Sequence, residues 1–200
     1  AGQLRSDGEK LAAKLVEKHQ FRLAVSVLND LGAGPHLVPN TVTNSGFENG
    51  VGAASASIFD WKIAAGSMPQ IALADQAHSG KVSLFFVFDS KRADAFREVK
   101  QVVAVEPGSR YRLSAFYKTE LRAADDVTMH LVVTSAATSA AIAASKSFAM
   151  NAEWAEALAD FEVPADTEGI VIKLVRDDCR SPICPLSGKL WLDDVTLTKE

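Results

Sequence analysis

The chain has 200 residues, of which 48% are hydrophobic, so it is long enough to bury one sizeable core. Charged residues make up 23% and the formal net charge is −4, a balance without the basic stripe that nucleic-acid binding requires. No window reaches the roughly 18 consecutive apolar residues of a membrane span. We therefore expect neither a nucleic-acid partner nor a membrane span.

Residues 1–34 have a helical pattern. The break near His19 and Gln20 predicts two short helices, and Gly32 predicts the end of the second. Apolar residues recur at helical spacing in two stripes, Leu11, Leu15 and Val16 in the first and Leu23, Val27, Leu28 and Leu31 in the second. The phrase FRLAVSVLNDLG resembles the last helix of a tetratricopeptide-type repeat. The alternative is a plain helical hairpin that packs on the domain behind it.

Residues 35–200 have the sequence pattern of a β domain. Short apolar runs, several of them alternating with period two, are separated by turns such as HSGK, EPGSR, PADTEG and LSGK. We expect strands near 37–43, 58–63, 70–73, 81–88, 98–105, 110–119, 126–133, 147–149, 154–162, 169–176 and 189–198. The run TSAATSAAIAAS is expected to be a loop or a weak strand. This spacing is typical of an antiparallel sandwich or barrel, and no low-complexity linker separates it from the helical segment.

Two cysteines, Cys179 and Cys184, lie in the phrase CRSPICPLSG. This spacing between prolines predicts a short disulfide loop, which would place the chain in the periplasm or outside the cell. Free thiols are the main alternative. Zinc would need further ligands nearby, and a redox pair is more often spaced C-x-x-C.

The order of phrases along the chain is more specific than any one of them. NSGFENG is followed by Trp61, HSGKVSL, QVVAVEPGSRYRLSAFYKTE, Trp154, FEVP and finally KLWLDDVTL. This series resembles the jelly-roll carbohydrate-binding modules that follow xylanases and cellulases, within the galactose-binding-like β-sandwiches. The resemblance covers about residues 37–200. It implies an antiparallel jelly-roll β-sandwich behind a short helical hairpin.

The resemblance also implies a structural calcium ion that joins the first strand to the last. Its ligands would be carboxylates from the GFE and DD phrases and backbone carbonyls around the SGK turn, here Gly46, Glu48, Ser79, Lys81 and Asp193. Ca²⁺ takes about 6–8 oxygen ligands and accepts carbonyls, so such a site is chemically reasonable. Alternatively, Glu48 pairs with a nearby Lys or Arg side chain or accepts turn N–H groups.

Only one of the two closing aspartates should face such an ion. In an alternating strand, Asp194 would share a face with Leu190 and Leu192, and Asp193 would share the other with Trp191 and Val195. The family pattern favours Asp193.

We expect no catalytic activity. The histidines His19, His36, His78 and His130 are scattered and form no hydrolase motif. The pairs Asp125–Asp126, Asp177–Asp178 and Asp193–Asp194 are adjacent in sequence, so in strands they would point to opposite faces and could not act as a glycosidase dyad.

Sugar-binding jelly rolls use aromatic rings on one sheet face, with polar groups beside them. Alternation predicts one such face, made of Phe85, Arg112, Phe116, Lys118 and His130. The leading hypothesis is a non-catalytic module that recognises a polysaccharide or oligosaccharide in the envelope or outside the cell. The alternatives are a protein-interaction domain at the end of a tetratricopeptide-like protein, with a solvated or helix-covered face, and an accessory domain of a larger enzyme.

Overall fold

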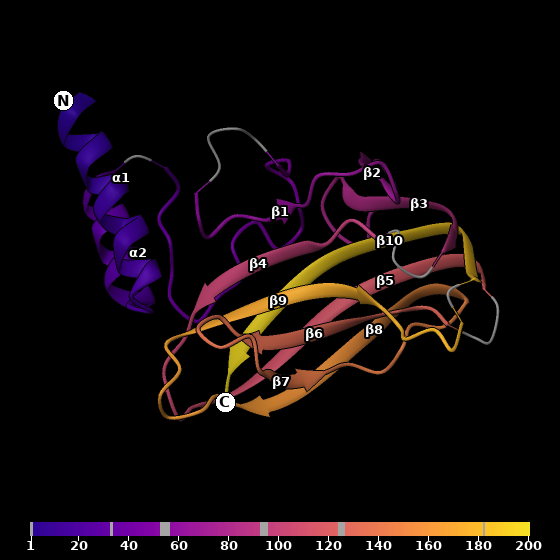
Figure 1. Cartoon of the computed structure of the whole chain (residues 1–200). Coiled ribbons are helices and arrows are strands. Elements are labelled where there is room, and N and C mark those ends of the chain that lie inside the picture. Colours follow the sequence, from indigo (N-terminus) through magenta and orange to yellow (C-terminus); the bar gives the residue numbers. More distant parts are fainter. Residues whose placement is uncertain (1, 33, 53–56, 93–95, 124–126, 182) are drawn as a thin grey trace.

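A computed structural model describes residues 2–32, 34–52, 57–92, 96–123, 127–181 and 183–200. Two five-stranded sheets are stacked face to face, with a pair of helices at one end (Figure 1). Sheet A has the order β1-β4-β9-β6-β7 and sheet B the order β2-β3-β10-β5-β8, and every pairing is antiparallel. The predicted fold class, a mainly β antiparallel jelly-roll sandwich with a short N-terminal helical hairpin, is confirmed.

The elements in chain order are α1 Gly2–Glu17, α2 Phe21–Asp30, β1 Lys62–Ile63, β2 Gln70–Ala74, β3 Ser83–Arg92, β4 Val99–Ala104, β5 Arg110–Ala123, β6 Met129–Ser135, β7 Ala141–Ala144, β8 Asn151–Glu162, β9 Gly169–Arg176 and β10 Ile183–Lys199. Residues 124–126, which include the pair Asp125–Asp126 and the first residue of the strand expected at 126–133, lie outside the described residues.

Side chains of β5 alternate between the core and the outer face. Tyr111, Leu113 and Ala115 are buried between the sheets, while Arg112 lies exposed on the opposite face. The same alternation in β9 buries Ile170, Ile172 and Leu174 from sheet A. Burial of these apolar side chains, worth about 1.5–3 kcal/mol each, holds the two layers together.

Three predicted strands differ from the structure at the edge of the sandwich. Residues 37–43 form no ladder, and at Thr43 the side-chain amide of Gln101 pairs with both the N–H and the C=O. Residues 147–149 also form no strand, and of 58–63 only β1 does. The run of small residues contributes the short edge strand β7.

The N-terminal hairpin divides where it was expected to. His19 has a left-handed backbone (φ 61°) and ends α1, and Gly32 (φ 58°) follows α2. Phe21 packs so closely on Gly169, the first residue of β9, that a Cβ there would lie 2.5 Å from its ring. The hairpin thus shares a small core with the sandwich. Its likeness to a tetratricopeptide repeat is not confirmed, and Leu11 and Leu23 of the predicted stripes are about half exposed.

Candidate functional site

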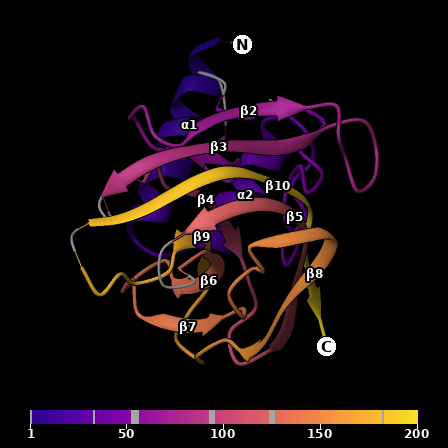
Figure 2. The same cartoon turned by 90° about the vertical axis from the view of Figure 1, so that its right-hand side faces the viewer.

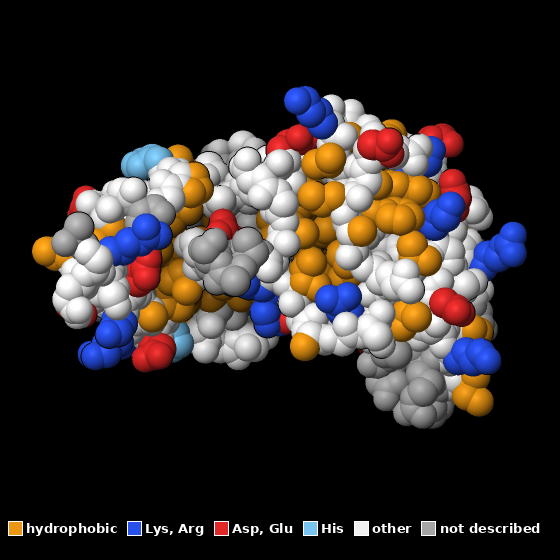
Figure 3. All heavy atoms as spheres, turned by 90° about the horizontal axis from the view of Figure 1, so that it is seen from above, with side chains coloured by type: hydrophobic (Ala, Val, Ile, Leu, Met, Phe, Trp, Pro, Cys, Tyr) orange, Lys and Arg blue, Asp and Glu red, His pale blue; other side chains and the backbone are white. Residues whose placement is uncertain are grey.

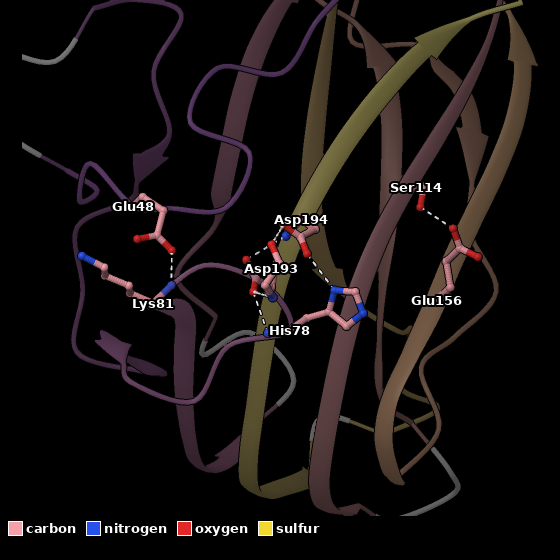
Figure 4. A network of polar contacts seen from close by, with 8 residues as sticks. Glu48, His78, Lys81, Ser114, Glu156, Asp193 and Asp194 are labelled. Atoms are coloured by element: carbon pink, nitrogen blue, oxygen red, sulfur yellow. Dashed lines mark hydrogen bonds and ion pairs between the residues drawn. The ribbon is translucent and has the colours of Figure 1, made fainter.

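The GFE and LDD segments lie side by side, as the resemblance implied. The N–H of Val195 donates to the C=O of Ser45 at 3.0 Å, and the side chain of Phe47 is buried against Trp61 with ring centroids 5.3 Å apart. Residues 43–46 and 48–49 are turns rather than the start of a strand, and Asn44 and Phe47 both adopt positive φ. The structure brings together the residues predicted to hold a cation (Figure 4).

Buried Asp193 fixes the turn between β2 and β3 to strand β10. One carboxylate oxygen of Asp193 accepts the backbone N–H groups of His78 at 2.8 Å and Ser79 at 3.2 Å, and the other accepts that of Asp194 at 2.8 Å (Figure 4). Burial raises the pKa of Asp193 above its ordinary value, and the neighbouring charge of Asp194 adds to this, although the three N–H groups oppose it.

Glu48 binds the same turn from the other side. Its Oε1 accepts the N–H groups of Lys81 at 2.7 Å and Val82 at 3.1 Å, and these bonds hold the pKa of Glu48 below its ordinary value. Gly80 (φ 68°) leaves the room for this contact, since a Cβ there would lie 2.2 Å from Oε1. Lys81 therefore presents its N–H to the carboxylate, whereas the sequence interpretation assigned carbonyls near this residue to a cation.

The alternation argument for the two aspartates was wrong at this point in β10. The register against β5 shifts between Asp193 and Thr196, and Asp194 has a left-handed backbone (φ 47°). A bulge of this kind re-aims side chains. As a result Val195 turns into the core, and one oxygen of each aspartate lies 3.5 Å from the Cβ position of Gly46.

Carboxylate and carbonyl oxygens at this junction are ligands of the kind that Ca²⁺ prefers, but some of the carboxylate oxygens already accept hydrogen bonds. The near oxygens of Asp193 and Glu48 accept backbone N–H groups, as described above. Within the ranges that the structure describes, no three His, Cys, Asp or Glu side chains are grouped to hold a metal. A cation here would therefore take backbone carbonyls for much of its coordination shell.

Phe85, Arg112, Phe116 and Lys118 share the outer face of sheet B, as predicted. The rings of Phe85 and Phe116, however, are in contact with other side chains. His78 stacks on Phe116 with centroids 3.6 Å apart, and Trp154 meets His78 edge-on at 5.6 Å. Nothing in the sequence spacing indicated this placement of His78, because it reaches the face from a turn.

Trp191 is buried on the same face. Phe85 packs against it at 5.0 Å, and the ammonium of Lys118 lies 5.9 Å from its ring centre. The charged groups are paired across the strands, Lys118 with Glu153 and Arg112 with Asp160, and the latter pair is solvent-exposed. Hydrophobic side chains also gather on this side of the molecule, over β2 and β3 (Figure 3).

His130 does not join these residues, which corrects the predicted face. The chain crosses from sheet B to sheet A between β5 and β6, so β6 pairs with β9 and β7 rather than with β5 (Figure 2). His130 lies on the outer face of sheet A, where its Nδ1 is 2.5 Å from an oxygen of Asp177. Asp177 also accepts the N–H of Thr128 at 2.9 Å, so this pair anchors the start of β6.

The outer face of sheet A carries a second group of half-buried side chains. Its central positions on β4, β9 and β6 are all half buried, although none belongs to the inter-sheet core: Lys100, Val102, Val171, Lys173, Val175, His130 and Val132. The valines form an apolar floor with charged groups among them. Helix α2 and the chain around it pack over one end of this face, at Ala104 and Gly169, and Val102 packs against the same helical cluster.

The disulfide between Cys179 and Cys184 is present, as predicted. It joins the loop that follows β9 to the start of β10, at the end of the sandwich opposite the helices (Figure 1). Neither described helix is long and apolar enough to cross a membrane.

No protein-family model matches the chain, and no curated protein matches its sequence. Solved structures share its fold. A CBM4 carbohydrate-binding module superposes with a TM-score of 0.56 over 80% of this chain and 99% of its own, at 14% identity. A family 61 carbohydrate-binding module solved in complex with β-1,4-galactotriose gives 0.53 over 82% and 100%, at 17% identity. The enzymatically active domain of tailspike protein 4 of bacteriophage CBA120 gives 0.58 over 80% of this chain but only 21% of its own, at 14% identity.

The chain therefore has the jelly-roll β-sandwich fold that carbohydrate-binding modules use. At these identities the likeness establishes the fold alone, because one fold hosts many functions.

Proposed function

We propose that this chain is a non-catalytic glycan-recognition module that works in the periplasm or outside the cell. The observation that carries the proposal is the outer face of sheet A, where half-buried valines adjoin lysine, histidine and carboxylate groups. An apolar floor with a few convergent polar groups is the usual composition of a ligand site. The shared fold with carbohydrate-binding modules supports a sugar ligand, and the disulfide supports an oxidising compartment.

The predicted residues of sheet B are the competing location for a sugar. Phe85, Arg112, Phe116 and Lys118 lie on the outer face of sheet B, but Phe116 is covered by His78 and the charges of Arg112 and Lys118 are paired. A sugar would have to displace these contacts to reach the rings. The cluster of Phe116, His78 and Trp154 is nonetheless partly exposed, which keeps this face in the test below.

A matched pair of valines separates the two faces. Val171 lies on the outer face of sheet A and Val87 on that of sheet B, and both are half buried. Val171→Gln should weaken the binding of an array-selected glycan at least about tenfold, because one misplaced polar side chain removes apolar contact and fills the floor. Val87→Gln should leave the affinity unchanged in calorimetric titration.

The reverse result, loss with Val87→Gln or Phe116→Ala, would move the site to sheet B. If the folded protein binds nothing on an array of plant and bacterial polysaccharides, the glycan proposal is wrong. The protein-interaction alternative would then lead, and the half-exposed Leu11 and Leu23 of the hairpin, together with Leu4, are the observation that favours it.

We also propose that Ca²⁺ binds at the junction of Gly46, Glu48, Ser79, Lys81 and Asp193. Two carboxylates from segments far apart in sequence converge there, and a cation would offset the charge of buried Asp193. Saturating Ca²⁺ at about 100 times its dissociation constant should add about 2.7 kcal/mol of stability. The melting temperature should therefore rise by about 5–10 °C with Ca²⁺ and fall with a chelator.

Glu48→Gln is the control for this cation site, because it should abolish the response to Ca²⁺. If the melting temperature of the unmodified protein changes with neither Ca²⁺ nor chelator, the cation is ruled out. In that case the N–H groups that bind Asp193 and Glu48 are sufficient to hold the junction.

A further inference from the structure

Three lysines lie in a row across the outer face of sheet A. Lys62 of β1 is directly opposite Lys100 of β4, and Lys100 is directly opposite Lys173 of β9. Directly opposed residues on antiparallel strands point to the same face, and neighbouring strands are about 4.8 Å apart. The three ammonium-bearing side chains therefore start from points within about 10 Å of one another.

The carboxylate of Glu98 accompanies this row. Glu98 lies 2.5 Å from the ammonium of Lys100 and 3.6 Å from that of Lys173. Burial raises the pKa of Glu98, but the hydrogen bonds and charges of Lys100 and Lys173 outweigh it and leave the pKa below its ordinary value. Like charges in direct opposition destabilise a sheet, so a row of lysines is costly unless it meets negative charge.

The row is distinctive because the protein as a whole is acidic, with a formal net charge of −4. It is also partly recessed, since the side chain of Lys173 is only 22% exposed. Val102 and Val171 lie directly beside the row on one side, and Val175 and His130 on the other. Apolar C–H groups of a sugar ring can rest on Val171 and Val175 while an acidic substituent reaches the ammonium groups.

We propose that this face binds an anionic glycan, a sugar chain whose carboxylate or sulfate groups pair with Lys100 and Lys173. The inference rests on the proposed function and adds to it the chemical class of the ligand. Glu98 positions the two ammonium groups, and an acidic sugar supplies the further negative charge. Nucleic acid is the less favoured polyanion, because the row spans only three adjacent strands, about 10 Å, which is short beside the phosphate backbone of a polymer.

The probes are acidic oligosaccharides with neutral counterparts of the same backbone. Oligogalacturonate and oligoglucuronate are compared with their methyl esters, and a sulfated galactan fragment with its desulfated form, by calorimetric titration of the full chain. At least one acidic form should bind about tenfold or more tightly than its neutral counterpart. That preference should shrink as salt rises from about 0.05 to about 0.5 M, because the Debye length falls several-fold.

Lys173→Gln and Lys100→Gln should each remove most of the tenfold preference, while Lys173→Arg should keep it. Lys189→Gln is the matched control, since Lys189 is exposed on the outer face of sheet B. Unchanged melting temperatures would show that the variants fold.

Two results would overturn the inference and leave the proposed function standing. The first is equal binding of acidic and neutral forms, and the second is an acidic preference that survives Lys173→Gln. Equal, lysine-dependent binding of single-stranded DNA would overturn it in favour of a general polyanion surface. If no glycan binds, acidic or neutral, the proposed function is wrong, and this inference is wrong with it.

Discussion

Replacing Asp193 by alanine is expected to lower the free energy of unfolding by about 3 kcal/mol. The carboxylate is buried and accepts the N–H groups of His78, Ser79 and Asp194. Alanine leaves these donors without an acceptor, at a cost of about 1–3 kcal/mol each, while loss of the buried charge offsets part of that cost. Urea unfolding measures the difference, provided that the slope with denaturant is unchanged.

The matched control for this prediction is Asp160→Ala. Asp160 is exposed and pairs with Arg112 on the outer face of sheet B, so its loss should barely move the unfolding midpoint. Asp193→Asn should lie between the two, because the amide keeps one acceptor oxygen. An Asp193→Ala protein as stable as the unmodified one would mean that the turn at 78–82 does not depend on this carboxylate. Both the turn assignment and the cation proposal would then lose their basis.

Replacing Gly188 by alanine is expected to lower the free energy of unfolding by about 4 kcal/mol, through backbone strain and overpacking together. Gly188 lies in β10 between β3 and β5, and its φ is 114°. A Cβ at this position would lie 2.0 Å from the carbonyl oxygen of Glu120 and 3.0 Å from the Cα of Leu121. Both contacts are with backbone, so no side-chain rotation can relieve them.

Gly108→Ala separates the two causes. Gly108 also has a positive φ, 68°, but nothing lies within 4 Å of its Cβ position. It should cost about 1–2 kcal/mol for the left-handed backbone alone. Thermal or urea unfolding of both variants gives the comparison. Equal losses at the two positions would contradict the close approach of β10 to β5, which is the contact that places Asp193 and Trp191 on sheet B.

Much of the fold follows from local patterns in the sequence. The strand expected at 169–176 is β9 residue for residue, and the break at His19 separates the two helices. The disulfide was predicted from two cysteines in one short loop. These features depend on neighbours in sequence, through alternation, backbone conformation or loop closure, so a single segment carries enough information. The boundary between residues 1–34 and 35–200 stays a prediction.

The candidate site depended instead on which strands pair. Alternation placed His130 on an outward face, but only the crossover between β5 and β6 decided that this face belongs to sheet A. A bulge at Asp193 brought both aspartates to Gly46, and no periodic pattern in the sequence predicts that bulge.

What the sequence determined by itself is therefore the class of fold and the inward or outward direction of most side chains. Only the tertiary structure set Lys62, Lys100 and Lys173 in one row and laid His78 on Phe116. The physical reason is that strand order and register are selected by burial summed over the whole sandwich, which no segment of ten or so residues can encode alone.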